Sequence, residues 1–357
     1  MTTLTDIGWT EEFAQKWRQH KADGLQPARV VADFGTSLRV AAPEIHTAEL
    51  SGKLAHHDGR EFVPKVGDWV VARPSGDGRM IVEAVLPRKN ELARKVTGNR
   101  TVKQVIAANI DIAFVLLALD ADFSVERLNR YLYQLSADHI DPVIVLNKAD
   151  KTDTADAYVE QLRDLGLPII VGSARNGVGV AEIAAFIQPG RTAILLGSSG
   201  VGKSTLTNQL LGTDTQQTNE VRASDSTGKH TTVHRELFVL PNGGLLIDTP
   251  GIRELQLWGT EDDLDENFDD IVALARQCQY RSCQHKNEAG CAVRAALEAG
   301  RLSAAHLANY QKMKRELVNL KAKNQVRAQL DNRKSHKLAQ RQKTAELKEI
   351  QDEINYT

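Results

Sequence analysis

Residues 197–204 have the sequence Gly-Ser-Ser-Gly-Val-Gly-Lys-Ser, which restricts the fold more than any other segment of the 357-residue chain. The apolar run Ala193–Leu196 precedes it, and a helical stretch to Leu211 follows, with Gly212 suited to end that helix. A strand, a glycine-rich loop and a helix in this order form a P-loop, whose backbone N–H groups and helix N-terminus surround phosphates. The segment therefore predicts an α/β domain that binds a nucleotide.

Individual residues of this loop are expected to contact different parts of the nucleotide and its Mg²⁺ ion. We expect Lys203 to reach the β- and γ-phosphates and Ser204 to offer its hydroxyl to Mg²⁺. The loop residues predicted to bind the nucleotide are Gly197, Ser198, Ser199, Gly200, Val201, Gly202, Lys203, Ser204 and Thr205.

The sequence Asn147-Lys148-Ala149-Asp150, after the strand-like run Val143–Leu146, predicts that the base is guanine. The Asp150 carboxylate can accept hydrogen bonds from the N1–H and the exocyclic amine of guanine. Adenine has a lone pair at N1 and no amine at C2, and a site built on such bonds rejects a base that cannot make them. Asn147 and Lys148 are expected to brace the loop and cover the base.

Backbone groups after a third strand are expected to contact the guanine oxygen. Ser173 and Ala174 follow the run Pro168–Val171, and a loop of small residues there can direct N–H groups at a ligand. An ordinary turn at the end of a strand would have the same sequence, so this prediction depends on its neighbours.

Residues on either side of another strand are expected to hold Mg²⁺ and the γ-phosphate. Asp248 follows the run Leu245–Ile247 and would bind Mg²⁺ through water, and Gly251 would offer its N–H to the γ-phosphate. Thr231 or Thr232, of which Thr232 is preferred, would place a hydroxyl on Mg²⁺ when GTP is bound. Either threonine can instead simply begin a strand.

Several residues are candidates for orienting the attacking water. Many GTPases place a glutamine shortly after this glycine, but here Ile252 follows, and an apolar side chain cannot orient water. His230 is the preferred catalytic candidate; a solvent-exposed loop histidine is the alternative, and His234 and Arg253 are weaker options.

All three cysteines of the chain fall in one short segment, Cys278-x4-Cys283-x-His285-x5-Cys291. Three thiolates and one imidazole make a closed tetrahedral set of the kind that binds structural zinc. The alternative is three buried cysteines and a surface histidine. We expect one Zn²⁺, and we expect the small domain around it to depend on that metal.

The pattern of apolar residues divides the chain into five segments. We predict a leader at 1–27 with a short helix near Glu11–His20, a β-barrel at 28–104, a GTPase domain at 105–262, a mostly helical zinc-binding domain at 263–311 and a basic helical tail at 312–357. The barrel is expected to be an OB-fold, with a β-sandwich fragment as the alternative. The basic stretch 87–105, which follows the last of the barrel strands, is interpreted as a solvated connector.

The strand-like runs behind this division fall into two sets. The barrel runs are Ala28–Phe34, Ser37–Ala41, Ile45–Leu50, Asp68–Ala72 and Arg79–Val85. The runs of the second set alternate with helical stretches, which predicts a mostly parallel sheet covered by helices; they are Ile112–Leu119, Val143–Leu146, Pro168–Val171, Ala193–Leu196, Glu236–Leu240 and Leu245–Ile247.

Composition excludes a membrane protein and a chain attracted as a whole to nucleic acid. The formal net charge is −1, so any attraction to RNA must come from local patches. The longest apolar run, Ile112–Leu119, is far shorter than the ~20 residues that span a bilayer, and Met1–Glu12 has no signal-peptide pattern. We expect a soluble cytoplasmic protein, with a monomer as the default.

The order of the motifs is unusual, because the guanine motif ends at Asp150, well before Gly197. The two can still share one crevice, since loops at the carboxyl ends of parallel strands meet regardless of chain order. With this order, a β-barrel in front and a Cys/His cluster behind, the sequence resembles the circularly permuted GTPases and most closely the bacterial ribosome-small-subunit-dependent GTPase family (RsgA, also called YjeQ), over roughly residues 28–310.

This resemblance implies an N-terminal OB-fold, a permuted GTPase core and a C-terminal zinc domain. It also implies GTP hydrolysis stimulated by the 30S subunit, a role in late maturation of that subunit, and contact with its 16S rRNA, to which an OB-fold and basic helices are suited. Two alternatives stay open: a GTP-dependent switch that acts on a protein partner without RNA, and a module that binds nucleotide without hydrolysing it.

The permuted order also predicts a mechanical link. Because the chain leaves the GTPase domain soon after Asp248–Gly251, we expect the nucleotide state to bias the position of the C-terminal domain.

Overall fold

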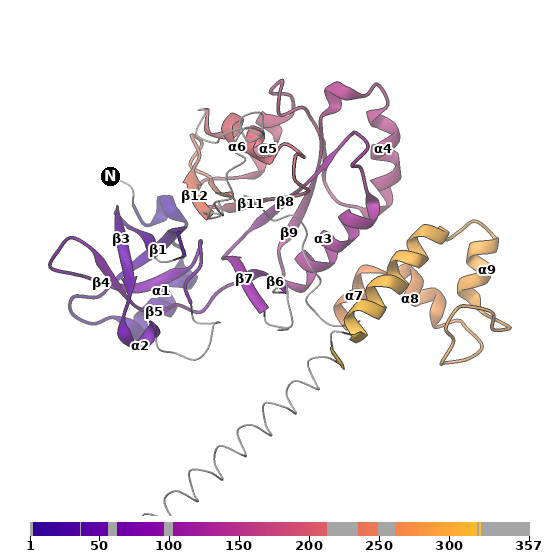
Figure 1. The fold of residues 1–357 in the computed structure, drawn as a ribbon, viewed down its shortest axis with the longest axis horizontal. Helices are drawn as coiled ribbons and strands as arrows, with labels where there is room; N and C mark the ends of the chain where they lie inside the picture. The colour runs from indigo at the N-terminus through magenta and orange to yellow at the C-terminus, as the bar shows by residue number, and fades with distance from the viewer. Residues whose placement is uncertain are drawn as a thin grey trace, which may run out of the picture. The chain divides into compact units, whose positions relative to one another are not determined.

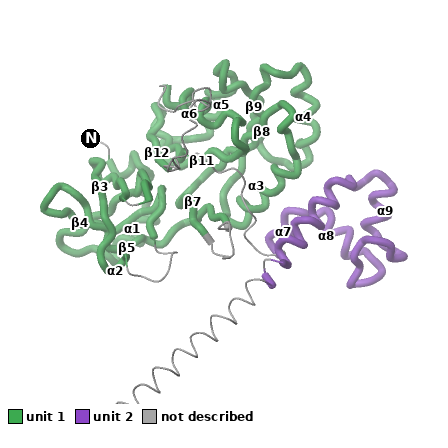
Figure 2. Tube along the Cα trace, viewed as in Figure 1, with its two compact units in different colours: residues 1–95, 103–259 green, residues 96–102, 260–357 purple. Residues whose placement is uncertain are grey.

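The structure is a computed structural model that describes residues 3–35, 37–55, 63–95, 103–212, 235–248, 261–319 and 321–322. The chain divides into two compact units, shown in Figure 2. Unit 1 comprises residues 1–95 and 103–259, and unit 2 comprises residues 96–102 and 260–357. The elements of both are labelled in Figure 1.

Five strands of unit 1 close into a barrel. They are β1 (Gln26–Asp33), β2 (Leu38–Ala42), β3 (Glu44–Leu50), β4 (Trp69–Pro74) and β5 (Met80–Val85), with the short helix α2 (Gly52–Ala55) after β3. Their order is β1-β2-β3-β5-β4, and β4 returns to pair with β1. β3 and β5 run parallel, whereas the other pairs are antiparallel. This closed five-stranded order is that of an OB-fold, so the predicted barrel is confirmed.

The residues before the barrel pack against it. They form η1 (Thr5–Ile7), α1 (Glu11–Trp17) and η2 (Arg18–His20), which confirms the short helix expected there. Ile7 and Phe13 are buried in the same apolar cluster as Trp69 of β4. The ring of Trp9 meets that of Trp69 edge-on, with centroids 4.6 Å apart. The first residues therefore contribute to the core of unit 1, although their sequence was interpreted as a leader.

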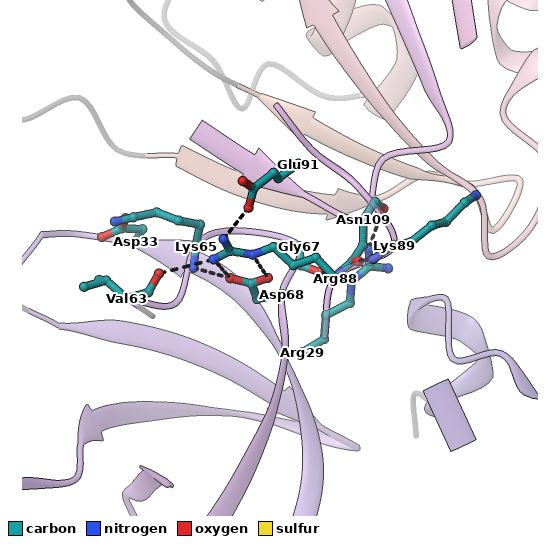
Figure 3. Close-up of polar contacts among 10 residues, drawn as sticks. All are labelled: Arg29, Asp33, Val63, Lys65, Gly67, Asp68, Arg88, Lys89, Glu91 and Asn109. Carbon is teal, nitrogen blue, oxygen red and sulfur yellow. Dashed lines mark hydrogen bonds and ion pairs between the residues drawn. The ribbon is translucent and has the colours of Figure 1, made fainter. Parts of the chain in front are cut away.

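The basic stretch after the barrel is not a solvated connector. Its residues form an antiparallel hairpin of β6 (Glu91–Lys95) and β7 (Lys103–Ala108). Arg88, which precedes the hairpin, donates from Nε and Nη2 to the fully buried carboxylate of Asp68, both at 2.8 Å, and from Nη1 to Glu91 (Figure 3). The interpretation of 87–105 as a solvated linker is wrong for the described residues, because carboxylates replace water around this cation.

The part of unit 1 that contains the P-loop sequence is a six-stranded, mostly parallel sheet, as predicted. Its strands are β8 (Ile112–Ala118), β9 (Asp141–Asn147), β10 (Ile169–Val171), β11 (Thr192–Leu196), β12 (Arg235–Val239) and β13 (Leu245–Asp248). They lie in the order β10-β9-β8-β11-β13-β12, and β12 alone among these runs antiparallel to its neighbour in that sheet. The helices and 3₁₀ turns between them are α3 (Val125–Ala137), η4 (Ala149–Lys151), α4 (Ala155–Leu162), η5 (Arg163–Leu165), α5 (Val180–Phe186) and α6 (Lys203–Leu211).

Both faces of this sheet are buried. Along β8, Val115 and Leu117 belong to one apolar cluster, whereas Phe114 and Leu116 belong to the other. Such a strand, apolar at every position, requires a covering layer on each side. The continuous apolar run that predicted a buried strand is therefore explained by the two clusters.

The barrel and the parallel sheet are joined within unit 1. β1 pairs with β12, with Ala32 opposite Glu236 and Asp33 opposite Arg235. The buried side chain of Arg29 crosses the junction and donates to the Thr192 hydroxyl at 2.8 Å. It also donates to the Gly67 carbonyl at 3.3 Å (Figure 3). Burial lowers the pKa of Arg29 to about 10, which leaves it charged at neutral pH. Hydrogen bonds of one cation therefore tie both sheets together.

Unit 2 is helical over its described residues. It contains α7 (Glu261–Asn267), α8 (Asp269–Ala275), α9 (Ala292–Glu298) and a further helix over residues 304–319. Its small core includes Phe268, Ile271, Val293 and Met313. The predicted basic helical tail is helical as far as residue 319, and its remainder, from 323, lies outside the described residues. Within the described ranges, no helix combines the length and apolar character needed to cross a bilayer.

Candidate functional site

One asparagine joins the three loops that the sequence assigned to the nucleotide. β9 and β11 flank β8 in the parallel part of the sheet, so the loops after their carboxyl ends open at one edge. The buried Asn147 donates from Nδ2 to the Val201 carbonyl at 2.7 Å, and its Oδ1 accepts from the Ala174 N–H at 2.8 Å. The structure therefore brings the guanine motif, the P-loop and the Ser173-Ala174 loop together.

Two glycines of the P-loop allow this close approach. Gly197 has φ +144° and Gly202 has φ +107°, which side chains rarely adopt. A Cβ on Gly197 would lie 2.6 Å from the Leu116 carbonyl oxygen, and one on Gly202 would lie 2.3 Å from Asn147 Nδ2. These two positions therefore require glycine for a packing reason in addition to the turn itself.

The Lys203 ammonium is held at the P-loop, where α6 begins. Its Nζ donates to the carbonyls of Gly197 and Ser198, both at 2.7 Å. Burial lowers the pKa of Lys203 to about 8, against the opposing effect of the Asp248 charge. A phosphate group would replace carbonyl partners with full negative charges, so this lysine is suited to bind one.

Asp150, the residue assigned to the base, lies beside the Ser173-Ala174 loop. Asp150 is exposed, and its Oδ1 accepts from the Ser173 hydroxyl at 2.5 Å. That hydrogen bond lowers the pKa of Asp150, so the carboxylate is ionised at neutral pH. An exposed carboxylate held by a loop that Asn147 joins to the P-loop is suited to guanine recognition.

The Mg²⁺ and catalytic assignments are only partly within the described residues. Asp248 is buried at the carboxyl end of β13, the strand beside β11, and Ser204 and Thr205 lie in the first turn of α6. The candidates Thr231, Thr232, Gly251 and His230 lie outside the described residues, as do His234 and Arg253, so these assignments stay predictions.

The three cysteines and the histidine of unit 2 lie together, as predicted. Their ligand atoms are all within 4.8 Å of one another. The His285 Nδ1 atom is 3.5 Å from Cys291 Sγ and 3.7 Å from Cys278 Sγ, and the two sulfurs are 3.9 Å apart. Metal distances of about 2.3 Å for sulfur and 2.0 Å for nitrogen place tetrahedral ligands roughly 3.5–3.8 Å apart. The donor set therefore fits one tetrahedral zinc ion.

The structure adds two residues that motif analysis does not assign, Asp120 and Asp122, in the loop after β8. Asp120 Oδ2 accepts from Lys148 Nζ at 2.8 Å, and the Asp122 carboxylate accepts from the Ser198 hydroxyl. The signal for both was present, because they are acidic residues just after a buried strand, as Asp150 and Asp248 are.

Comparisons with known proteins agree with this geometry. The model of the family described as RsgA GTPase matches residues 85–258, and that described as 50S ribosome-binding GTPase matches residues 192–331. A curated protein from Opitutus terrae, named small ribosomal subunit biogenesis GTPase RsgA, is 42% identical over 88% of this chain and 89% of its own length. A protein of the same name from Xanthomonas axonopodis pv. citri is 43% identical, covering 93% of each chain.

Two solved structures are similar in fold. The crystal structure of YjeQ from Thermotoga maritima is 26% identical, covers 82% of this chain and 99% of its own, and superposes with a TM-score of 0.60. The structure of YloQ, described as a circularly permuted GTPase, is 24% identical, covers 84% and 97%, and has a TM-score of 0.57. The second likeness concerns the fold alone.

Proposed function

The chain is a GTP-hydrolysing enzyme of the RsgA family of small ribosomal subunit biogenesis GTPases, and we propose that it acts in late maturation of the 30S subunit. In this proposal it binds 16S rRNA, and the subunit stimulates its hydrolysis of GTP to GDP and phosphate. We also propose that it is a cytoplasmic monomer.

The position of Asn147 supports GTP as the substrate most directly. Because its two hydrogen bonds join the P-loop to the loop beside Asp150, the base and the phosphates of one nucleotide can lie on opposite sides of this residue. In the proposed complex Asp150 pairs with the guanine N1–H and amine, Lys148 covers the base, and the N–H groups of the Ser173-Ala174 loop face the guanine oxygen.

In the proposed reaction, water attacks the γ-phosphorus in line with the bridging oxygen to the β-phosphate. That P–O bond breaks, and the charge passes to the departing GDP. Lys203 stabilises the negative charge that develops on these oxygens. Ser204, Thr232 and, through water, Asp248 would hold the Mg²⁺ ion that accompanies GTP, and the ion would supply positive charge to the phosphates. His230 is proposed to orient the attacking water.

The Cys/His cluster is proposed to hold one structural zinc ion. Its four protein ligands would leave no coordination position for a substrate, so it is assigned no part in hydrolysis. We propose that the metal fixes the surface of unit 2 for contact with the ribosomal subunit.

Turnover of GTP with and without purified small ribosomal subunits, at two salt concentrations, tests the proposal. We expect slow intrinsic hydrolysis, strong stimulation by the subunits, and a steep loss of that stimulation as salt rises, because contacts to several phosphates release counterions. Stimulation insensitive to salt would favour a protein partner without RNA contact, and absence of stimulation would contradict the proposal.

The variant His230→Ala tests the catalytic assignment separately. We expect unchanged affinity for GTP and loss of the stimulated turnover, because the residue is proposed to act on water and not on the nucleotide. An unchanged stimulated kcat would remove His230 from the mechanism.

A further inference from the structure

The loop that joins β8 to α3, residues 119–124, lies between the guanine motif and the P-loop. β8 is hydrogen-bonded in parallel to β9 on one side and to β11 on the other. The carboxyl end of β8 therefore opens between the loops that follow those two strands. The Leu119 N–H donates to the Asn147 carbonyl at 2.9 Å, so the loop begins against the guanine motif.

Asp120 connects this loop to the guanine motif. Its Oδ2 accepts from Lys148 Nζ at 2.8 Å, and both side chains are about a quarter exposed, at 28% and 24%. Its Oδ1 accepts from the Asp122 N–H at 3.0 Å, and its carbonyl accepts from the Phe123 N–H at 3.0 Å. The loop thus fixes the carboxylate with one oxygen directed at the lysine. The hydrogen bond from Lys148 lowers the pKa of Asp120, so the carboxylate is ionised at neutral pH.

Asp122 connects the same loop to the P-loop. Its carboxylate accepts from the hydroxyl of Ser198, the second P-loop residue, and from Arg127 Nη1 at 2.8 Å. The bond from Arg127, and then that from Ser198, lowers the pKa of Asp122, which keeps this acceptor ionised as well.

The loop has its own anchors on the two helices beside it. Ser124 caps α3 by accepting the Arg127 N–H at 3.2 Å. The ring of Phe123 meets that of Tyr158, on α4, edge-on with centroids 4.7 Å apart. The two carboxylates therefore lie on a loop that both helices anchor. From there they can restrain the side chains of Lys148 and Ser198 in the neighbouring loops.

We propose that Asp120 and Asp122 are positioning residues of the nucleotide site. Asp120 holds the Lys148 ammonium so that the methylene stem of this lysine lies along the guanine ring, and Asp122 fixes the start of the P-loop through Ser198. This inference rests on the proposed function of the pocket as a GTP site. A lysine that is already held loses less conformational freedom when the base binds, so affinity rises without any new contact to the nucleotide.

The variant Asp120→Asn tests the first part. Asparagine keeps the shape of the side chain and an oxygen for the Asp122 N–H, but it removes the charge that faces Lys148. A partly exposed ion pair contributes modestly, so we expect GDP and a non-hydrolysable GTP analogue to bind about fivefold more weakly. Because Lys148 covers the base, both nucleotides should lose affinity equally, with KM raised and kcat unchanged.

The matched control is Asp141→Asn. Asp141 is exposed at the amino end of β9, at the opposite end of that strand from Asn147, and the substitution makes the same change of charge. Nucleotide affinity should stay at the wild-type value. Fluorescent nucleotide titrations on the full chain measure both variants.

A double-mutant cycle separates positioning from a merely structural role. In the background of Lys148→Ala, the substitution Asp120→Asn should have no further effect on nucleotide affinity, because its partner is already absent. A fivefold loss that persists in that background would overturn the assignment of Asp120. The same cycle with Asp122→Ala and Ser198→Ala tests Asp122, and an undiminished effect of Asp122→Ala in the Ser198→Ala background would overturn that part.

The result also distinguishes this inference from the proposed function. A wild-type chain that binds no guanine nucleotide would contradict the proposed function itself. A wild-type chain that binds GDP tightly, together with Asp120→Asn and Asp122→Ala variants of wild-type affinity, would overturn the positioning role alone.

Discussion

The nucleotide site of unit 1 is supported by far more buried structure than the Cys/His cluster of unit 2. β8 and β11, which lead into the loops of the nucleotide site, are buried at every position. The cluster lies beside α8 and α9, which have seven residues each, and two of its cysteines are only half-buried. Helices of this length are not stable alone in water.

The difference indicates how far the structure of each site depends on its ligand. The P-loop and the guanine motif are positioned by hydrogen bonds within the protein, such as those of Asn147, so a nucleotide would meet loops that are already in place. The Cys/His cluster has a small core behind it, and a metal ion would supply much of the folding free energy of unit 2. Four predictions test this contrast.

Removal of the metal should have the largest effect, and only on unit 2. We expect a zinc chelator to abolish the hydrogen-exchange protection of residues 261–319, because four metal bonds would be lost from a domain with little other core. Residues 193–212 of the same chain are the internal control, and GDP affinity should change by about twofold or less. Undiminished protection of 261–319 in metal-free protein would show that the helices fold without metal.

The variant Asp150→Asn should cause the next largest loss. The amide can no longer accept from both guanine donors, so we expect GDP to bind about a hundredfold more weakly. Its NH₂ group can donate to the C2 carbonyl of xanthine, so XDP should bind more tightly than it does to the wild type. Titration with GDP and XDP measures the change in affinity for each nucleotide. The control is Asp153→Asn, which changes an exposed carboxylate three residues further along the chain. Equal loss of GDP and XDP would argue against direct contact with the base.

The variant Gly202→Ala should weaken nucleotide binding by about tenfold or more, because a left-handed backbone and a collision with Asn147 both oppose the methyl group. Gly212→Ala is the matched control at the other end of α6: it has φ +67° but no atom within 4 Å of the added Cβ. It should lower the free energy of unfolding by about 1 kcal/mol and leave GDP affinity unchanged. If both variants bind GDP equally well, the contact between the two loops is not needed.

The pH dependence of GDP affinity should show the smallest effect. Burial lowers the pKa of Lys203 to about 8 in the free protein, and phosphates raise it in the complex, so binding takes up a proton. Affinity should therefore fall by about fourfold from pH 7 to pH 8.5, a range in which guanine N1 stays protonated. The variant Lys203→Arg stays charged throughout and should show a flat profile. A flat profile in the wild type would mean that Lys203 is fully charged before the nucleotide binds.

Sequence patterns predicted the strands of both sheets closely and failed where the partner of a charge lies far along the chain. The strand-like runs predicted all five barrel strands, and three of the loops predicted to bind the nucleotide lie together around Asn147. Arg88 was interpreted as a solvated residue because nothing near it in sequence indicates burial. Its partner, Asp68, lies two strands earlier in the chain, before β4 and β5, and the closed barrel brings the two together.

The sequence by itself determined the elements and the local patterns. The P-loop, the carboxylate proposed for guanine and the four proposed metal ligands are each set by neighbouring residues, whose spacing acts through one loop or one turn. The tertiary structure alone decided that β8 lies between β9 and β11, and so that Asp120 meets Lys148 and Asp122 meets Ser198. Strand order depends on the packing of the whole sheet, because the neighbours of a strand are set by the burial of both faces of the sheet at once. No local sequence pattern encodes that order.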